Sequence, residues 1–197
     1  MGLSRQAKIL SKTMEQSALK HLAGTRYPVR YHVMFLLSVK AGLRAKEISS
    51  LKWAMVLDAD GRIDDAIRLI DNAAKGSNGG RVIPLNRELL LALSALYSEL
   101  GDKAQPHLEV IRSERGIRMS PQTVTNWFHK TYKKLGLEGC SSHSGRRTFA
   151  TRAAKAIISA GGSLRDVQQL LGHSSLATTQ RYLEGSEDAK KRVVDMV

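Results

Sequence analysis

The apolar residues of this chain recur at helical spacing on both sides of one short interruption, and this interruption limits the folds that the chain can adopt. Within it, valine and isoleucine gather in three short runs, at residues 53–57, 66–70 and 81–85. Asp60-Gly61 separates the first two runs, and the glycine-rich residues 76–80 separate the second two. The sequence therefore predicts a three-stranded antiparallel meander inside a mostly α-helical, or α+β, fold.

Signals at the ends of helices place the remaining elements. Thr13 and Gln16 fit a capping box, Asn86 fits an N-cap, and Ser120-Pro121 fits the N-cap and first-turn pattern of a further helix. Ala41-Gly42 is expected to end the apolar helix before it. The predicted helices begin at Thr13 and then span residues 29–39, 44–51, 87–100, 121–135, 145–159, 163–171 and 176–183.

Charge is the most unusual feature of the composition. The 197 residues carry a formal net charge of +13, which favours a polyanionic partner, either a nucleic acid or an anionic membrane surface. No apolar run approaches the roughly 20 residues that a membrane-spanning helix needs, and a secretory signal is not evident. Cys140 is the single cysteine, which excludes an internal disulfide and any zinc site built on several thiolates. These features predict a cytoplasmic protein that binds nucleic acid.

The last third of the chain holds an ordered group of reactive side chains: His143, Arg146, His173 and Tyr182. Cations can hold a phosphate, imidazoles can handle protons, and a phenol can attack a phosphodiester. Each residue alone has an ordinary structural interpretation, since a histidine after a helix is often a cap and a helical tyrosine is often half-buried. The order and spacing of the whole group carry the hypothesis.

These motifs resemble the tyrosine recombinase (phage integrase) family, and the resemblance extends from about Lys12 to Gly185. It implies that Arg44, which follows a Gly-Leu step, is the first catalytic arginine, and that Glu47 orients it. It also implies that Lys75, in the turn between the second and third predicted strands, is the general acid for the departing 5′-oxygen. Without the resemblance, Arg44 could be a solvated helix-start residue and Lys75 a solvated hairpin tip.

By the same resemblance, His143 and Arg146 form the His-x-x-Arg box, and Leu170-Leu-Gly-His173 matches the Leu-Gly-His box. Tyr182 is then the nucleophile. The family usually has an apolar residue before the boxed arginine and often a histidine after it, whereas this chain has Gly145 and Arg147. Arg147 is expected to contact the DNA backbone. Neither histidine has the neighbours of a zinc site, so no metal and no cofactor are expected.

The resemblance implies a recombinase or integrase of bacterial or phage origin that cuts and rejoins double-stranded DNA through a 3′-phosphotyrosyl intermediate, without metal or ATP. It also implies a homotetramer on DNA, which could be a monomer without DNA. Two alternatives remain open at this point. A type IB topoisomerase shares the chemistry but religates the same strand, and a non-catalytic DNA-binding regulator would keep the fold alone.

The expected organisation is a short arm at residues 1–11, a catalytic domain at 12–185 and a C-terminal tail at 186–197. In the tail, Val193, Val194 and Val197 share one helical face, which could fold back on its own core or be exchanged between protomers. Family members usually carry a further DNA-binding domain before the catalytic one. The chain could therefore be a piece of a longer recombinase or a stand-alone one.

Overall fold

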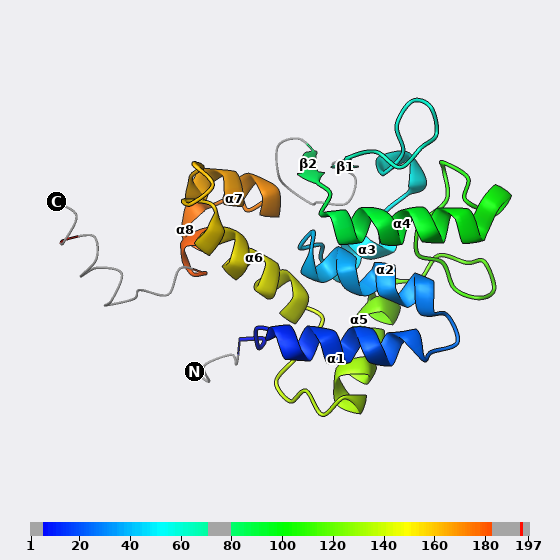
Figure 1. The fold of residues 1–197 in the computed structure, drawn as a ribbon, viewed down its shortest axis with the longest axis horizontal. Helices are drawn as coiled ribbons and strands as arrows, with labels where there is room; N and C mark the ends of the chain where they lie inside the picture. Colours follow the sequence, from blue (N-terminus) through cyan, green and yellow to red (C-terminus); the bar gives the residue numbers. More distant parts are fainter. Residues whose placement is uncertain (1–5, 71–79, 183–193, 195–197) are drawn as a thin grey trace. The chain divides into compact units, whose positions relative to one another are not determined.

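The polypeptide folds into two units that divide within helix α6 (Ser144–Ala156), the first ending at Phe149 and the second beginning at Ala150. The computed structural model describes residues 6–70, 80–182 and 194 (Figure 1). The expected tail therefore lies largely outside the described residues, as do residues 1–5 of the expected arm, and the predicted boundaries at 11/12 and 185/186 stay predictions. Among the described helices, none is long and apolar enough to cross a membrane.

The first unit is built around the apolar helix α2 (Pro28–Val39), in which every side chain from Val33 to Val39 is buried. Helix α2 lies between α1 (Lys12–Ala23) and α4 (Arg87–Leu100), and the short helix α3 (Ala45–Ser50) packs against α5 (Pro121–Lys134) (Figure 1). Because α2 is covered on two sides, its C-terminal end and the turn into α3 are held firmly in the core.

The predicted helix starts are mostly confirmed. Asn86 accepts the Glu88 N–H at the start of α4, and Ser120 accepts the Thr123 N–H at the start of α5. The predicted capping box at Thr13 is wrong, because Ser11 is the N-cap of α1 and accepts the Met14 N–H. Both hydroxyls suit an N-cap, so local sequence alone does not choose between them.

The mostly helical fold with a small antiparallel sheet is confirmed, but the strand count is corrected. Among the described residues the sheet has two strands, β1 (Ala66–Leu69) and β2 (Arg81–Pro84), which pair with Ile67 opposite Ile83. The expected first strand instead contains the 3₁₀ helix η1 (Trp53–Met55). Trp53 and Val56 are both buried at a spacing of three, and the Trp53 N–H donates to Leu108 rather than to β1.

The second unit contains the last part of α6, helix α7 (Leu164–Leu171) and helix α8 (Leu176–Gln180). Gly172 adopts the left-handed conformation with φ of +59° and ends α7, and the next N–H, that of His173, donates back to the Gln168 carbonyl. Helix α8 is shorter than predicted, so Tyr182 lies in a turn after it, with its N–H donating to Thr179.

Candidate active site

Glu47 is the centre of a cluster of arginines in the first unit. Its carboxylate is buried in α3 and accepts two parallel hydrogen bonds from Arg81, Nη1 to Oε1 at 2.8 Å and Nη2 to Oε2 at 3.0 Å. Nη1 of Arg44 donates to Oε1 at 3.0 Å, and Nη1 of Arg146 lies 3.9 Å from Oε2. One carboxylate thus holds three guanidinium groups together.

Arg44 is the most open member of this cluster. It is the N-cap residue of α3, and its backbone N–H donates to Oε2 of Glu47 at 2.7 Å while its side chain reaches Oε1 of the same carboxylate. The Arg44 side chain is 41% exposed, whereas that of Glu47 is 4% exposed. These two bonds place the Glu47 carboxylate against Arg44, and its role in orienting Arg44 stays a prediction. Part of the Arg44 guanidinium stays accessible to an anion.

Arg146 reaches the cluster from α6 because of the turn that follows α2. Gly42 has φ of +65°, and a Cβ atom there would lie 2.5 Å from the Phe149 ring. The left-handed turn directs the Gly42 carbonyl toward Arg146, whose Nη1 donates to it at 2.6 Å. The Arg146 side chain is buried, so this bond and Glu47 fix its orientation.

Gly145, the departure from the usual family box, has a packing explanation. A Cβ atom at this position would lie 2.2 Å from Oγ of Ser38 in α2. Any larger residue would push α6 away from α2 and move Arg146 with it. The glycine therefore allows the close contact that places the neighbouring arginine.

Electrostatics in this cluster keep Glu47 ionised. Burial alone would raise the pKa of its carboxyl, but the hydrogen bonds and charge of Arg81, the N–H of Arg44 and the charge of Arg146 lower the pKa below its ordinary value of 4.5. A lowered pKa in the folded state means that the ionised carboxylate stabilises the fold. This contribution is complete above the ordinary pKa and is lost as the pH falls through the folded-state value.

Glu47→Gln should therefore lower the free energy of unfolding by about 3 kcal/mol at pH 7, because it leaves a buried guanidinium without its counter-charge. Urea denaturation at pH 7 and again near pH 3 measures the effect, which should shrink at the lower pH. Asp60→Asn is the matched control, since Asp60 forms an exposed pair with Arg62 and should contribute little. An equal loss for both variants would contradict the buried cluster as a source of stability.

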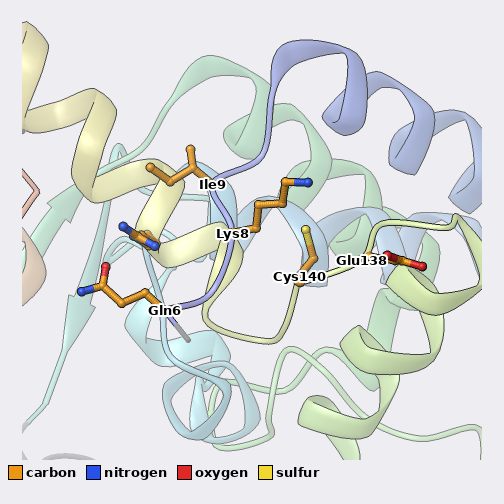
Figure 2. A pocket seen from close by; sticks show the side chains of 7 residues that line it. Gln6, Lys8, Ile9, Glu138 and Cys140 are labelled. Carbon is orange, nitrogen blue, oxygen red and sulfur yellow. The ribbon is translucent and has the colours of Figure 1, made fainter. Parts of the chain in front are cut away.

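His143 and Arg147 lie beside this cluster in sequence, at the start of α6. His143 is exposed, and its carbonyl accepts the Arg147 N–H. The Arg147 guanidinium donates to the Ala7 carbonyl at 2.7 Å. It lines an open pocket of about 730 Å³, around which Figure 2 labels Gln6, Lys8, Ile9, Glu138 and Cys140. The expected DNA contact by Arg147 stays a prediction.

In the second unit, His173 and Tyr182 lie together. Their rings stack with centroids 5.9 Å apart and an interplanar angle of 11°. Nδ1 of His173 is 2.9 Å from Oγ1 of Thr179, a buried residue of α8. This bond fixes the orientation of the imidazole, and the stack fixes the tyrosine ring beside it.

The structure thus brings five of the predicted residues together in two sets. Arg44, Glu47 and Arg146 meet in the first unit, and His173 and Tyr182 meet in the second. Lys75 lies outside the described residues. In the described parts of the chain, no three side chains of the metal-binding types gather. Sequence reasoning missed Arg81 and Thr179; the position of Arg81 directly after the glycine-rich residues 76–80 was the available signal for the first.

Comparison with known proteins gives this arrangement its context. The model of the phage integrase family matches residues 8–188, which is nearly the whole chain. The chain belongs to the phage integrase family. The resemblance found in its motifs is therefore confirmed at the level of the family.

Curated members of this family include tyrosine recombinases of archaea and bacteria. The chain is 32% identical to tyrosine recombinase XerA of Pyrococcus horikoshii over 178 residues, covering 89% of this chain and 57% of that protein. It is 33% identical to XerC of Actinobacillus pleuropneumoniae over 175 residues, covering 88% of this chain and 50% of that protein. The chain therefore spans little more than half the length of these relatives.

Solved structures show the same fold. The Tn1549 transposon integrase in complex with transposon right end DNA superposes with a TM-score of 0.73 at 21% identity, covering 96% of this chain and 65% of that one. XerA recombinase gives a TM-score of 0.71 at 23% identity, covering 95% of this chain and 64% of that one. The fold of the phage integrase catalytic region is therefore present here.

Proposed function

We propose that this chain catalyses strand transfer on double-stranded DNA, as the catalytic region of a site-specific recombinase. The observation that carries the proposal is the cluster of Arg44, Arg81 and Arg146 around the buried Glu47. Three guanidinium groups and one carboxylate give this cluster a net charge of +2. Membership of the phage integrase family supports the same conclusion.

Arg44 and Arg146 are proposed to hold the scissile phosphate. A guanidinium can donate two parallel hydrogen bonds to two oxygens of a phosphate, which a lysine cannot. During attack by an ionised phenol, the phosphodiester gains a second negative charge. A preorganised cluster of charge +2 offsets that charge where it develops, in the role that metal ions take in other phosphoryl-transfer enzymes.

Tyr182 is proposed as the nucleophile. Its Oη forms a bond to phosphorus as the bond from phosphorus to the 5′-oxygen breaks, which gives a 3′-phosphotyrosyl bond and a 5′-hydroxyl. The phenol releases its proton to water, and the departing oxygen takes one from the ammonium group of Lys75. A 5′-hydroxyl of another strand then reverses the step, so the energy of the phosphodiester is conserved without ATP. His143 and His173 are proposed to orient the phosphate.

This mechanism requires the arginine cluster and Tyr182 to act on one phosphate. The stack on His173 and the Thr179 bond support a held position for the tyrosine ring. DNA is the proposed partner, because a net charge of +13 favours a polyanion and solved relatives of this fold are described with DNA. A homotetramer on paired sites is the proposed working assembly.

Covalent trapping tests the proposal whatever the sequence of the target site. A pool of duplexes with randomised cores, each nicked beside the possible cleavage positions, is incubated with the protein in excess EDTA. Adducts that survive denaturation are recovered and sequenced. We expect adducts through Tyr182 that share a sequence, and we expect no loss of yield in EDTA, since the proposed mechanism uses cationic side chains in place of metal ions.

Three other results would contradict parts of the proposal. A strict requirement for a divalent ion in cleavage would remove the metal-free mechanism. Relaxation of supercoiled DNA without exchange between duplexes would indicate a topoisomerase. DNA binding with no adduct on any sequence would indicate a regulator that keeps the fold without the reaction.

A further inference from the structure

Arg81 occupies an unusual position among the three arginines. It is the first residue of β2, whereas Arg44 lies at the start of α3 and Arg146 in α6. It alone forms the two-pronged pair with Glu47, at 2.8 and 3.0 Å, and its side chain is only 13% exposed against 41% for Arg44. Arg81 therefore faces the carboxylate rather than the surface.

The backbone before Arg81 is closely constrained. A Cβ atom at Gly80 would lie 2.1 Å from the Leu69 carbonyl oxygen, so the two strands touch where β2 begins. The pairing of Leu69 with Arg81 fixes the register at the same point. The strand pairing therefore fixes the backbone position from which the Arg81 guanidinium reaches Glu47, which lowers the entropy lost when the pair forms.

From this geometry we infer that Arg81 is a positioning residue that neutralises Glu47, so that Arg44 and Arg146 keep their positive charge for the phosphate. Glu47 is needed to hold Arg44 at the N-terminus of α3, but a carboxylate paired with only these two guanidinium groups would offset half of their charge. Arg81 supplies the missing counter-charge through its two parallel bonds to the carboxylate. This inference deepens the proposed function and rests on it.

The inference makes a specific claim about coupling. Arg81 should matter only while Glu47 is negatively charged. In Arg81→Met the cluster retains two guanidinium groups and one carboxylate, with a net charge of +1. In the double variant Arg81→Met/Glu47→Gln the net charge returns to +2. The double variant removes both members of the buried Arg81–Glu47 pair together, so it should fold.

Single-turnover cleavage measures this coupling, on a duplex that carries the sequence recovered by covalent trapping. We expect Arg81→Met to slow cleavage by roughly 10- to 100-fold, by analogy with the loss that follows removal of a group that orients a metal ligand. We expect Arg81→Met/Glu47→Gln to cleave as fast as Glu47→Gln alone, so that the effect of Arg81 disappears when Glu47 is neutral. Arg81→Lys keeps the charge without the fork and should show a smaller loss.

The matched control is Arg68→Met. Arg68 lies in β1 of the same sheet, pairs with Asp64 at 2.9 Å and is exposed. Its loss lowers the charge of the protein by the same amount, and it should leave cleavage unchanged. Circular dichroism and thermal melting establish that each variant is folded at the assay temperature.

Two outcomes would overturn the inference. One is cleavage by Arg81→Met at the rate of the parent protein. The other is a double variant that is folded yet cleaves at least about tenfold more slowly than Glu47→Gln, a cost of about 1.4 kcal/mol, because Arg81 would then act independently of the carboxylate charge. If Arg81→Met does not fold, the comparison of the double variant with Glu47→Gln still decides.

Failure of the proposed function gives a different signature. If the parent protein forms no adduct, the affinity of the cluster for inorganic phosphate is measured instead. The change in the ¹⁵N signal of Arg44 Nε is followed while phosphate is added. The inference expects weaker phosphate binding in Arg81→Met and recovery in Arg81→Met/Glu47→Gln. Equal phosphate affinity in all of these variants would refute it, whatever the activity of the chain.

Discussion

Replacing Tyr182 with phenylalanine should abolish the covalent protein–DNA adduct while changing DNA affinity by only a few-fold. The substitution removes one oxygen and keeps the ring, so the stack on His173 at 5.9 Å can be retained. A neutral phenol is a weak nucleophile, and only a tyrosine beside stabilising cations could attack a phosphodiester at a useful rate. The sequence motifs predict that Tyr182 acts beside such cations.

The measurement is adduct formation on a nicked duplex, resolved on a denaturing gel, beside an equilibrium binding curve at fixed salt. Tyr97→Phe is the matched control, because Tyr97, in α4, is also partly buried but packs on Trp53. It should form the adduct normally. An adduct that persists in Tyr182→Phe would remove Tyr182 as the nucleophile and would require a search among the other hydroxyl groups.

The helices were predictable because their signals are local. Asn86 and Ser120 cap the helices that follow them, and Gly42 forms the turn after α2, since each of these preferences depends on a few neighbouring residues. The third strand was not predictable in this way. The run at residues 53–57 has strand-like composition, but burial of Trp53 under the Tyr97 ring and the bond to Leu108 select a 3₁₀ turn instead.

In the candidate site too, local motifs were predictable from the sequence and contacts between distant residues were not. The order of Arg44, His143, Arg146, His173 and Tyr182 could be read from motifs, because each motif occupies a few consecutive residues. The role of Arg81 could not, since it depends on a contact between residues 34 positions apart. The Gly145 departure from the family box also needs the structure for its explanation, because Ser38 occupies the space that a side chain would fill.

Lys75→Ala should slow cleavage by roughly 10²- to 10⁴-fold, the contribution expected of a positioned general acid. The resemblance to the family alone gives Lys75 this role, so its test must separate proton transfer from phosphate binding. A substrate with sulfur in place of the bridging 5′-oxygen does this, because a thiolate leaves readily without being protonated. Most of the lost rate should return on that substrate.

The same substrate should give no recovery for a variant that weakens the grip on the phosphate, and Arg44→Ala is the comparison. Arg44 holds its place through the backbone and side-chain bonds to Glu47 and is proposed to contact non-bridging oxygens, which the sulfur substitution leaves unchanged. Lys103→Ala, an exposed lysine in η3 (Gly101–Lys103), controls for the loss of one charge. If Lys75→Ala is equally slow on both substrates, Lys75 has a role other than general acid catalysis, and the proton for the 5′-oxygen must come from another group.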